Sequence, residues 1–185
     1  MATEDQISKM KEAGLHAYNH NVDTSEEYYS DIITTHTHDD RMETLKNIRN
    51  AGVTICSGGI IGMGETDEDR IKMIHSLATL EKHPESVPIN ALVSIEGTPL
   101  EKQKEVNTWD MIRMISTARI TMPKSMVRLS AGRLSMSKEA QTLCFLAGAN
   151  SIFSGEKLLT TPNPSVNEDL ELFNILGLSP RPSHH

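Results

Sequence analysis

Residues 55–65 read ICSGGIIGMGE and join a predicted strand to a predicted helix. The β-branched run at 53–55 predicts a strand, and Thr66 followed three residues later by Asp69 has the spacing of a capping box. A cysteine therefore ends a strand, and a glycine-rich turn follows it. The glycines allow positive φ angles and a close approach of the backbone to a ligand. The simpler alternative is a tight turn with a buried, inert Cys56, since free cysteines are often buried. Glu65 is suited either to bind a ligand or to cap the helix.

The rest of the chain alternates between predicted helices and predicted strands. Strands are expected at 15–18, 53–57, 87–93, 126–130 and 151–153. Helices are expected after Thr3, Thr37, Thr66, Thr108 and Ser137, and from about Asn167 to Gly177. Residues 155–164 are expected to form a loop, and Pro88 indicates an irregular start to the third strand. Such alternation predicts parallel strands joined by helical crossovers, the pattern of the α/β class.

Two parallel architectures fit this alternation, an open doubly wound sheet and a (βα)8 barrel. Polar or metal-binding side chains lie at or near the carboxyl end of every predicted strand: Asn19, Cys56, Asn90, Arg128 and Ser151. Barrel active sites are built from these ends, whereas an open sheet concentrates function at one switch point. Five strands cannot close an eight-stranded barrel. We therefore expect an incomplete (βα)8 TIM-type barrel over residues 1–178, without its first strands, and a disordered tail at 179–185.

The composition excludes several classes of partner. The net charge is −7 and no run of Lys or Arg occurs, so neither nucleic acid nor an anionic membrane is expected as a partner. No apolar run approaches the roughly 20 residues of a membrane span. The first residues are polar and acidic, and they resemble neither a signal peptide nor a transit peptide. The 2 cysteines make no disulfide framework. This favours a reducing compartment: the cytoplasm, or the mitochondrion in a eukaryote.

Asn19, Asn21 and Asp23 place carbonyl-bearing side chains at alternate positions. If this run is extended, all of them face the same way and are suited to hold paired N–H donors and vicinal hydroxyls, as a ureido ring and a ribose present them. The alternative is an Asn- and Asp-rich loop that caps its own backbone. Arg128 lies in a strand between apolar neighbours, and it is either a ligand or the partner of an unseen carboxylate.

Other candidate residues have weaker patterns. Arg41 and Arg133 are suited to clamp a carboxylate, although exposed arginines are common. His36 and His38 have the spacing of a metal-binding pair, but they lie in a polar loop before a helix, where capping or exposure is expected instead. Cys144 lies on the apolar side of a predicted helix and is expected in the core.

Six sequence blocks resemble those of the biotin synthases, members of the radical S-adenosylmethionine superfamily. They are YNHNVDT (18–24), CSGG (56–59), SVPIN (86–90), VRLSAGR (127–133), ANSIF (149–153) and LLTTP (158–162). The blocks occur in the family's order, and the resemblance extends from about Gln6 to Gly177. The pattern Gly58-x-Ile60-x-Gly62-x-x-Glu65 is similar to a more general feature of radical S-adenosylmethionine barrels.

The resemblance implies an activity and a set of site residues. The family inserts sulfur into dethiobiotin to give biotin; a 4Fe-4S cluster cleaves S-adenosylmethionine to a deoxyadenosyl radical, and a 2Fe-2S cluster supplies the sulfur. By resemblance, Cys56 is one of three thiolate ligands of the 2Fe-2S cluster, and Arg128 is its fourth ligand. Substrate and S-adenosylmethionine contacts are matched by Asn19, Asn21, Asp23 and Asn90 for the ureido ring and the ribose, by Ile60 and Val93 for adenine, and by Arg41 for the methionine carboxylate. The family also implies a homodimer.

The sequence departs from the family in its cysteines. The CxxxCxxC motif that holds the 4Fe-4S cluster is absent, and the 2 cysteines are Cys56 and Cys144. We therefore expect the C-terminal part of a biotin synthase, which alone is inactive. Two alternatives stay open. One is a non-catalytic module that binds dethiobiotin or an adenosyl group. The other is a part of a barrel that a separate N-terminal chain, or a copy of this chain, completes.

Overall fold

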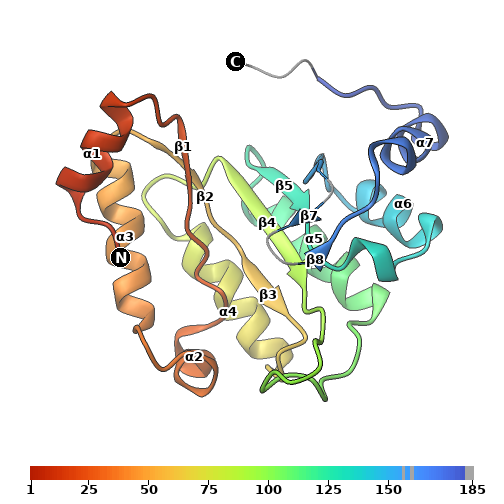
Figure 1. Cartoon of the computed structure of the whole chain (residues 1–185), viewed down its shortest axis with the longest axis horizontal. Helices are drawn as coiled ribbons and strands as arrows, with labels where there is room; N and C mark the ends of the chain where they lie inside the picture. Colours follow the sequence, from red (N-terminus) through yellow and green to blue (C-terminus); the bar gives the residue numbers. More distant parts are fainter. Residues whose placement is uncertain (156, 159–160, 182–185) are drawn as a thin grey trace.

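The computed structural model describes residues 1–155, 157–158 and 161–181, and its central feature is a curved parallel sheet (Figure 1). The strands of this sheet are β1 (Ala17–Asn19), β2 (Thr54–Cys56), β3 (Gly59–Ile61), β4 (Ser86–Ala91), β5 (Met126–Leu129) and β6 (Ser151–Ile152). Their order is β1-β2-β4-β5-β6, with β3 also paired to β4, and every pairing is parallel. The prediction of an α/β fold with about five parallel strands is therefore confirmed.

β2 and β3 are two parts of one interrupted strand, because both pair with β4. Residues 59–61 are therefore strand, where a turn was predicted. The interruption lies at Gly58, where an added Cβ would stand 1.9 Å from the carbonyl oxygen of Pro88. Pro88 pairs with Arg128 inside β4, so the prediction of an irregular strand start was wrong. Because the Pro88 backbone faces the interruption, its missing N–H removes no bond from the ladder.

The helices are α1 (Glu4–Glu12), α2 (Glu26–Ile32), α3 (His38–Asn50), α4 (Asp67–Ala78), α5 (Thr108–Thr121), α6 (Lys138–Leu146) and α7 (Val166–Leu176). Thr3, Thr37 and Thr66 form the predicted capping boxes, and Ser137 caps α6. α5 differs from the prediction, because its N-cap is Asn107 and not Thr108. The side chain of Asn107 accepts a hydrogen bond from the Trp109 amide. α2 was not predicted, since it is short and offers little apolar periodicity.

The C-terminal part holds two further differences from the prediction. An antiparallel pair of short strands, β7 (Lys157–Leu158) and β8 (Thr161–Pro162), lies where a loop was expected, and a 3-10 helix, η1 (Arg133–Ser135), follows β5. Of the predicted disordered tail, residues 179–181 are exposed. Residues 182–185 lie outside the described residues.

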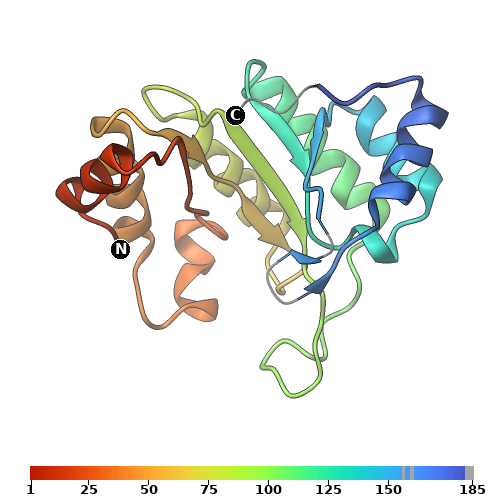
Figure 2. The same ribbon diagram turned by 45° about the horizontal axis from the view of Figure 1, so that its top comes forward.

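Side chains alternate between the two faces of the sheet. Along β5, Val127 and Leu129 are fully buried, whereas Met126 is 45% exposed. The buried face packs against α3, α4, α5 and α6, which lie on the same side of the sheet in Figure 2. By register, Asn19, Cys56 and Arg128 belong to the opposite face, which these helices leave open.

Among the residues that the structure describes, no helix has both the length and the apolar character that crossing a membrane requires.

Candidate functional site

The carboxyl ends of β1 and β2 bring Asn19 beside Cys56. The two residues are partners in the parallel register, and the Asn19 amide Nδ2 donates to the Cys56 Sγ at 3.2 Å. Cys56 is 8% exposed, yet it does not belong to the hydrophobic core cluster, which contains Cys144 instead. The sulfur of Cys56 therefore has a polar partner on the open face of the sheet, whereas no hydrogen bond is recorded for the sulfur of Cys144 within the described residues. The prediction that Cys144 lies in the core is confirmed.

The segment after β1 winds along the interrupted strand. The Asn21 Oδ1 accepts from the Gly58 amide at 3.2 Å, and the carbonyl of Asp23 accepts from the Ile60 amide at 2.8 Å. Among the described residues, Asp23 is the only non-glycine residue with a positive φ, which is 68°. Strained backbone of this kind is concentrated at functional sites, where the surroundings hold it in place.

Arg41 reaches this segment from α3. Its Nη2 lies 2.9 Å from the Asp23 Oδ2, and its Nε donates to the Tyr29 hydroxyl at 2.8 Å. Burial raises the pKa of Asp23, and the Arg41 cation opposes this shift. The structure therefore brings Arg41 and Asp23 together as an ion pair at the edge of the site. Tyr29, which sequence reasoning missed, orients the guanidinium.

His20 is a second residue that sequence reasoning missed. Its ring lies edge-on to Tyr18 at 6.2 Å, and its Nε2 is buried without a hydrogen-bond partner among the described residues. Burial first, and then the Arg41 cation, lower the pKa of His20 to about 4. The imidazole is therefore neutral near pH 7. No sequence pattern separates this buried histidine from the exposed Asn19 and the half-buried Asn21 beside it.

Asn90 ties β3 to the turn after β5. Its Nδ2 donates to the Gly59 carbonyl at 2.9 Å, and its Oδ1 accepts from the Ala131 amide at 3.2 Å. Ile60, its register partner on β3, is half-buried. Val93, beyond the end of β4, is exposed. The residues expected to hold ring and ribose groups therefore also fix the strand ends on which they lie.

Arg128 lies on the open face of β5, half-buried between Pro88 of β4 and Ser151 of β6. Its Nε donates to the Ser151 Oγ at 3.2 Å. No ion pair of Arg128 occurs within residues 1–155, 157–158 and 161–181, so no carboxylate partner accounts for it there. Standard strand spacings place its Cα roughly 12 Å from that of Cys56, across one strand. A long side chain spans part of that distance.

The remaining candidates are structural. Arg133 is fully buried, where it pairs with Asp169 and donates to Gln141, so the carboxylate that it holds belongs to the chain itself, and the alternative of an exposed arginine was wrong at this position. Its surroundings were not readable from the sequence because Asp169 lies on the distant α7.

His38 and Cys144, the other candidates for metal or thiol chemistry, are buried and packed against other side chains. His38 is buried edge-on against Tyr29 at 5.7 Å, and the described part of the chain contains no group of three or more His, Cys, Asp or Glu side chains that would hold a metal. Cys144 is fully buried, and burial raises the pKa of its thiol to about 12.

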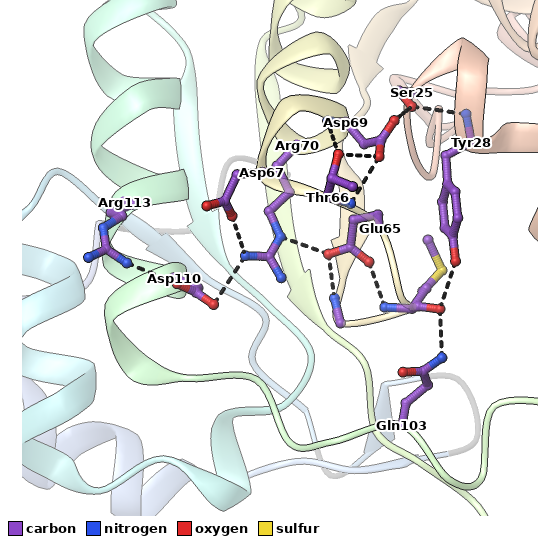
Figure 3. A network of polar contacts seen from close by, with 12 residues as sticks. Ser25, Tyr28, Glu65, Thr66, Asp67, Asp69, Arg70, Gln103, Asp110 and Arg113 are labelled. Atoms are coloured by element: carbon purple, nitrogen blue, oxygen red, sulfur yellow. Dashed lines mark hydrogen bonds and ion pairs between the residues drawn. The ribbon is translucent and has the colours of Figure 1, made fainter.

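Glu65 caps the turn rather than the helix (Figure 3). Its two carboxylate oxygens accept from the amides of Gly62 and Met63, each at 2.7 Å. Gly62 and Gly64 have the predicted positive φ, of 95° and 111°. Gly58 and Gly59 do not, and they serve close packing instead.

Two family models and several known proteins match this chain. A model described as "Radical SAM superfamily" matches residues 1–77, and one described as "Biotin and Thiamin Synthesis associated domain" matches residues 88–179. The chain is 65% identical over 183 residues to a biotin synthase of Cytophaga hutchinsonii, covering 99% of this chain and 54% of that protein. It is 63% identical over 182 residues to a mitochondrial biotin synthase of Arabidopsis thaliana, covering 98% and 48%. The chain thus spans about half the length of the curated relatives it matches.

Solved structures share the fold at lower sequence identity. Methylornithine synthase superposes with a TM-score of 0.79 at 21% identity, over 97% of this chain and 56% of that one. The FeFe-hydrogenase maturase HydG from Carboxydothermus hydrogenoformans superposes with a TM-score of 0.76 at 14% identity, over 96% and 45%. At these identities the likeness concerns the fold alone.

Proposed function

We infer the function from the premise that this chain belongs to the biotin synthases of the radical S-adenosylmethionine superfamily and corresponds to their C-terminal part. We propose that residues 1–178 supply the C-terminal strands of a (βα)8 barrel in which sulfur is inserted into dethiobiotin to give biotin. One observation carries the proposal: Asn19, Cys56 and Arg128 share the sheet face that the helices leave open. Barrel enzymes assemble their sites from such strand ends.

The residues present fit part of a 2Fe-2S cluster. Biotin synthases, as radical S-adenosylmethionine enzymes, use iron–sulfur clusters. Such clusters are held by protein ligands that are mainly thiolates, and in this proposal Cys56 and Arg128 supply two of them. When bound, the cluster would supply the sulfur atom. Cys144 does not fit as a ligand, because it is fully buried among the core residues of α6. No residues are proposed for the 4Fe-4S cluster, since the chain has no CxxxCxxC motif.

We assign the side chains near Cys56 and Asn90 to different groups of the two proposed ligands, dethiobiotin and S-adenosylmethionine. Asn19, Asn21, Asp23 and Asn90 would hold the ureido ring of dethiobiotin and the ribose of S-adenosylmethionine, because amide and carboxylate oxygens accept from N–H and hydroxyl groups. Ile60 and Val93 would flank adenine. Arg41 would attract the methionine carboxylate while its ion pair holds Asp23 in place.

The cellular compartment of the chain is proposed from its free cysteines and from the names of its relatives. A reducing compartment suits a chain with a required free Cys56. We place the chain in the cytoplasm of a bacterium, or in the mitochondrion as the name of the Arabidopsis relative indicates for that protein. The family implies a homodimer of complete barrels.

Reconstitution in two pieces tests the proposal. The chain is co-expressed with the N-terminal half of the Cytophaga hutchinsonii relative, and biotin formation from dethiobiotin is measured under reducing conditions with S-adenosylmethionine. Biotin is expected from the assembled pair and from neither piece alone. Cys56→Ala is expected to abolish it, and Cys144→Ala serves as the matched control. Biotin formed by this chain alone, or an unaffected Cys56→Ala pair, would overturn the proposal.

One observation favours a second, non-catalytic function for the isolated chain. The segment of Asn21 and the strand end of Asn90 are hydrogen-bonded within the chain itself, so part of the ligand site is formed without further strands. A preorganised site of this kind binds without a catalytic centre. Titration of the melting temperature with dethiobiotin checks this: a rise that Asn90→Ala removes supports a binding module, and a flat curve contradicts it.

A further inference from the structure

The turn after β3 is held by a polar network to which the proposed reaction assigns no role (Figure 3). The carboxylate of Glu65 satisfies the amides of Gly62 and Met63, so the turn is fixed from inside by one side chain. Figure 3 shows this carboxylate lying between the turn and the guanidinium of Arg70. The Glu65 side chain is 1% exposed, and a carboxylate so deeply buried needs a cation beside it.

Arg70 provides that cation and connects it to a second helix. Its Nε donates to Glu65 at 2.8 Å, and its Nη1 lies 3.1 Å from Asp110 on α5 and 3.1 Å from Asp67. Burial would lower the pKa of Arg70, but Glu65 and Asp110 outweigh burial and raise it, so the guanidinium stays charged. The position of the guanidinium is thus set by α5 as well as by its own helix α4.

The opposite side of the turn is fixed through one carbonyl group. The Met63 carbonyl accepts from the Tyr28 hydroxyl at 3.2 Å and from the Gln103 Nε2 at 3.0 Å. The turn therefore has anchors on α2, on the segment before α5, and on the Arg70 pair. It begins directly after Ile60 and Ile61, so its position determines where the end of β3 lies.

We propose that Arg70 is a positioning residue for the adenosyl group of S-adenosylmethionine. Arg70 acts through Glu65: it holds the carboxylate that shapes the turn, and the turn holds Ile60 in place against adenine. Asp110 in turn holds Arg70, so that α5 sets the geometry of the adenosyl site. The inference rests on the proposed function, in which Ile60 lies beside adenine. A supporting side chain that loosens by a fraction of an ångström weakens such a site without unfolding the chain.

Three matched substitutions on the chain test the inference. Arg70→Gln removes the cation, Asp110→Asn removes the tie to α5 while keeping the Arg70–Glu65 pair, and Asp67→Asn removes only a contact to a carboxylate that is 90% exposed. The first readout is hydrogen exchange at the Gly62 and Met63 amides. The second is calorimetric affinity for S-adenosylhomocysteine, with dethiobiotin as the comparison ligand.

The expected pattern is graded and selective. Arg70→Gln should speed the hydrogen exchange of both amides and lower the affinity for S-adenosylhomocysteine roughly tenfold. Asp110→Asn should lower this affinity roughly threefold, and Asp67→Asn should leave it unchanged. The affinity for dethiobiotin should stay the same in all three variants. Equal losses for both ligands would show a merely structural role and overturn the inference. So would faster amide exchange with unchanged S-adenosylhomocysteine affinity. If Arg70→Gln does not fold, Asp110→Asn decides by the same criteria.

Failure of the proposed function gives a different result. An unmodified chain that binds no S-adenosylhomocysteine would overturn the adenosyl site itself. The exchange rates of Gly62 and Met63 would still decide whether Arg70 orders the turn.

Discussion

The two cysteines of the chain have opposite surroundings. Cys56 ends β2 on the open face with an amide donor on its sulfur, whereas Cys144 is enclosed by the core, and burial raises the pKa of its thiol to about 12. Composition cannot make this distinction, because both residues follow apolar neighbours. The register of β1 against β2 makes it, by putting Asn19 opposite Cys56.

The first prediction concerns Cys56 and Arg128 in the assembled enzyme. Cys56→Ala should remove the two-iron signal in electron paramagnetic resonance of the reduced sample and abolish biotin formation, because a thiolate is lost. Arg128→Met should keep the signal and lower the yield by roughly tenfold, since Arg128 would adjust the cluster's surroundings rather than secure it. Cys144→Ala is the control, with a small loss of packing. A Cys56→Ala enzyme with a normal signal and normal yield would contradict the ligand assignment.

The roles of single residues could be predicted from the sequence where a family pattern or the neighbouring residues in the chain indicate them. The roles proposed for Asn19, Cys56 and Arg128 came from such matches, and the structure places these residues on one face. Arg133 was misread because its partner Asp169 is remote in the sequence. Tyr29 was missed for the same reason, since its bond to Arg41 depends on how α2 meets α3.

The start of β4 is tied to two other elements by Glu85. Its carboxylate accepts from Arg49 of α3 at 2.8 Å and from the Ile55 amide of β2 at 2.9 Å, and Lys82 lies 2.7 Å away. Burial would raise the pKa of Glu85, but these donors outweigh it and lower the pKa to about 2. The amino-terminal end of the sheet is therefore closed by one charged side chain, away from the proposed site.

The second prediction follows from that low pKa. A carboxyl whose pKa is depressed from 4.5 to about 2 on folding stabilises the folded chain fully above about pH 5, and this stabilisation is lost as the pH falls toward 2. Glu85→Gln should therefore cost about 2 kcal/mol in the free energy of unfolding at pH 7 and progressively less below pH 4. Urea titrations at several pH values measure it. The exposed Glu81→Gln is the control, and an equal cost at pH 7 and pH 2.5 would contradict the ion-pair account.

Elements were predictable where their ends carry local signals. Thr3, Thr37 and Thr66 each accept a hydrogen bond from the backbone amide three residues later, and the side chain of that later residue accepts from the threonine's own amide. The helices begin where this spacing predicts. β3, β7 and β8 were missed because they are short and depend on pairing with another strand, β3 with β4 and β7 with β8. Short strands carry too few residues to show a period of two.

The sheet ends at β1 on one side and at β6 on the other, and neither edge pairs with a further strand in the described part of the chain. Beside β6, apolar side chains of α6 and α7 line an opening of about 670 Å³ that includes Phe145, Leu146 and Phe173. Open edges and apolar openings are surfaces that proteins cover. The described part of the chain therefore has two unpaired sheet edges, and an apolar opening lies beside one of them.

The third prediction is that the isolated chain self-associates. Its sedimentation coefficient should rise with concentration, and a hydrophobic dye should bind to it, because apolar surface beside β6 is open. Co-expression with the N-terminal half of a relative should suppress both effects, whereas an unrelated acidic protein of similar size should not. A compact monomer at all concentrations, with little dye binding, would show that the edges are covered in another way.

The overall architecture was predictable because helix and strand alternate along the whole chain, and only a parallel sheet with crossovers satisfies that order. The choice of barrel over open sheet rested on where polar residues stand at the strand ends. It is supported by the radical S-adenosylmethionine relatives and by the solved structures that share the fold. The order of elements does not predict the interruption between β2 and β3, which depends on the contact between Gly58 and Pro88 of β4.

The break between β2 and β3 couples two residues that are distant in the sequence. Gly58 has no room for a side chain beside Pro88, and Pro88 offers no N–H to a continuous neighbouring strand. A regular strand would need both residues to change together, because a lone replacement of Gly58 meets a backbone clash and a lone replacement of Pro88 leaves a donor facing the gap. The effects of substitutions at these two positions on the free energy of unfolding are therefore expected to be non-additive, since each residue makes room for the other.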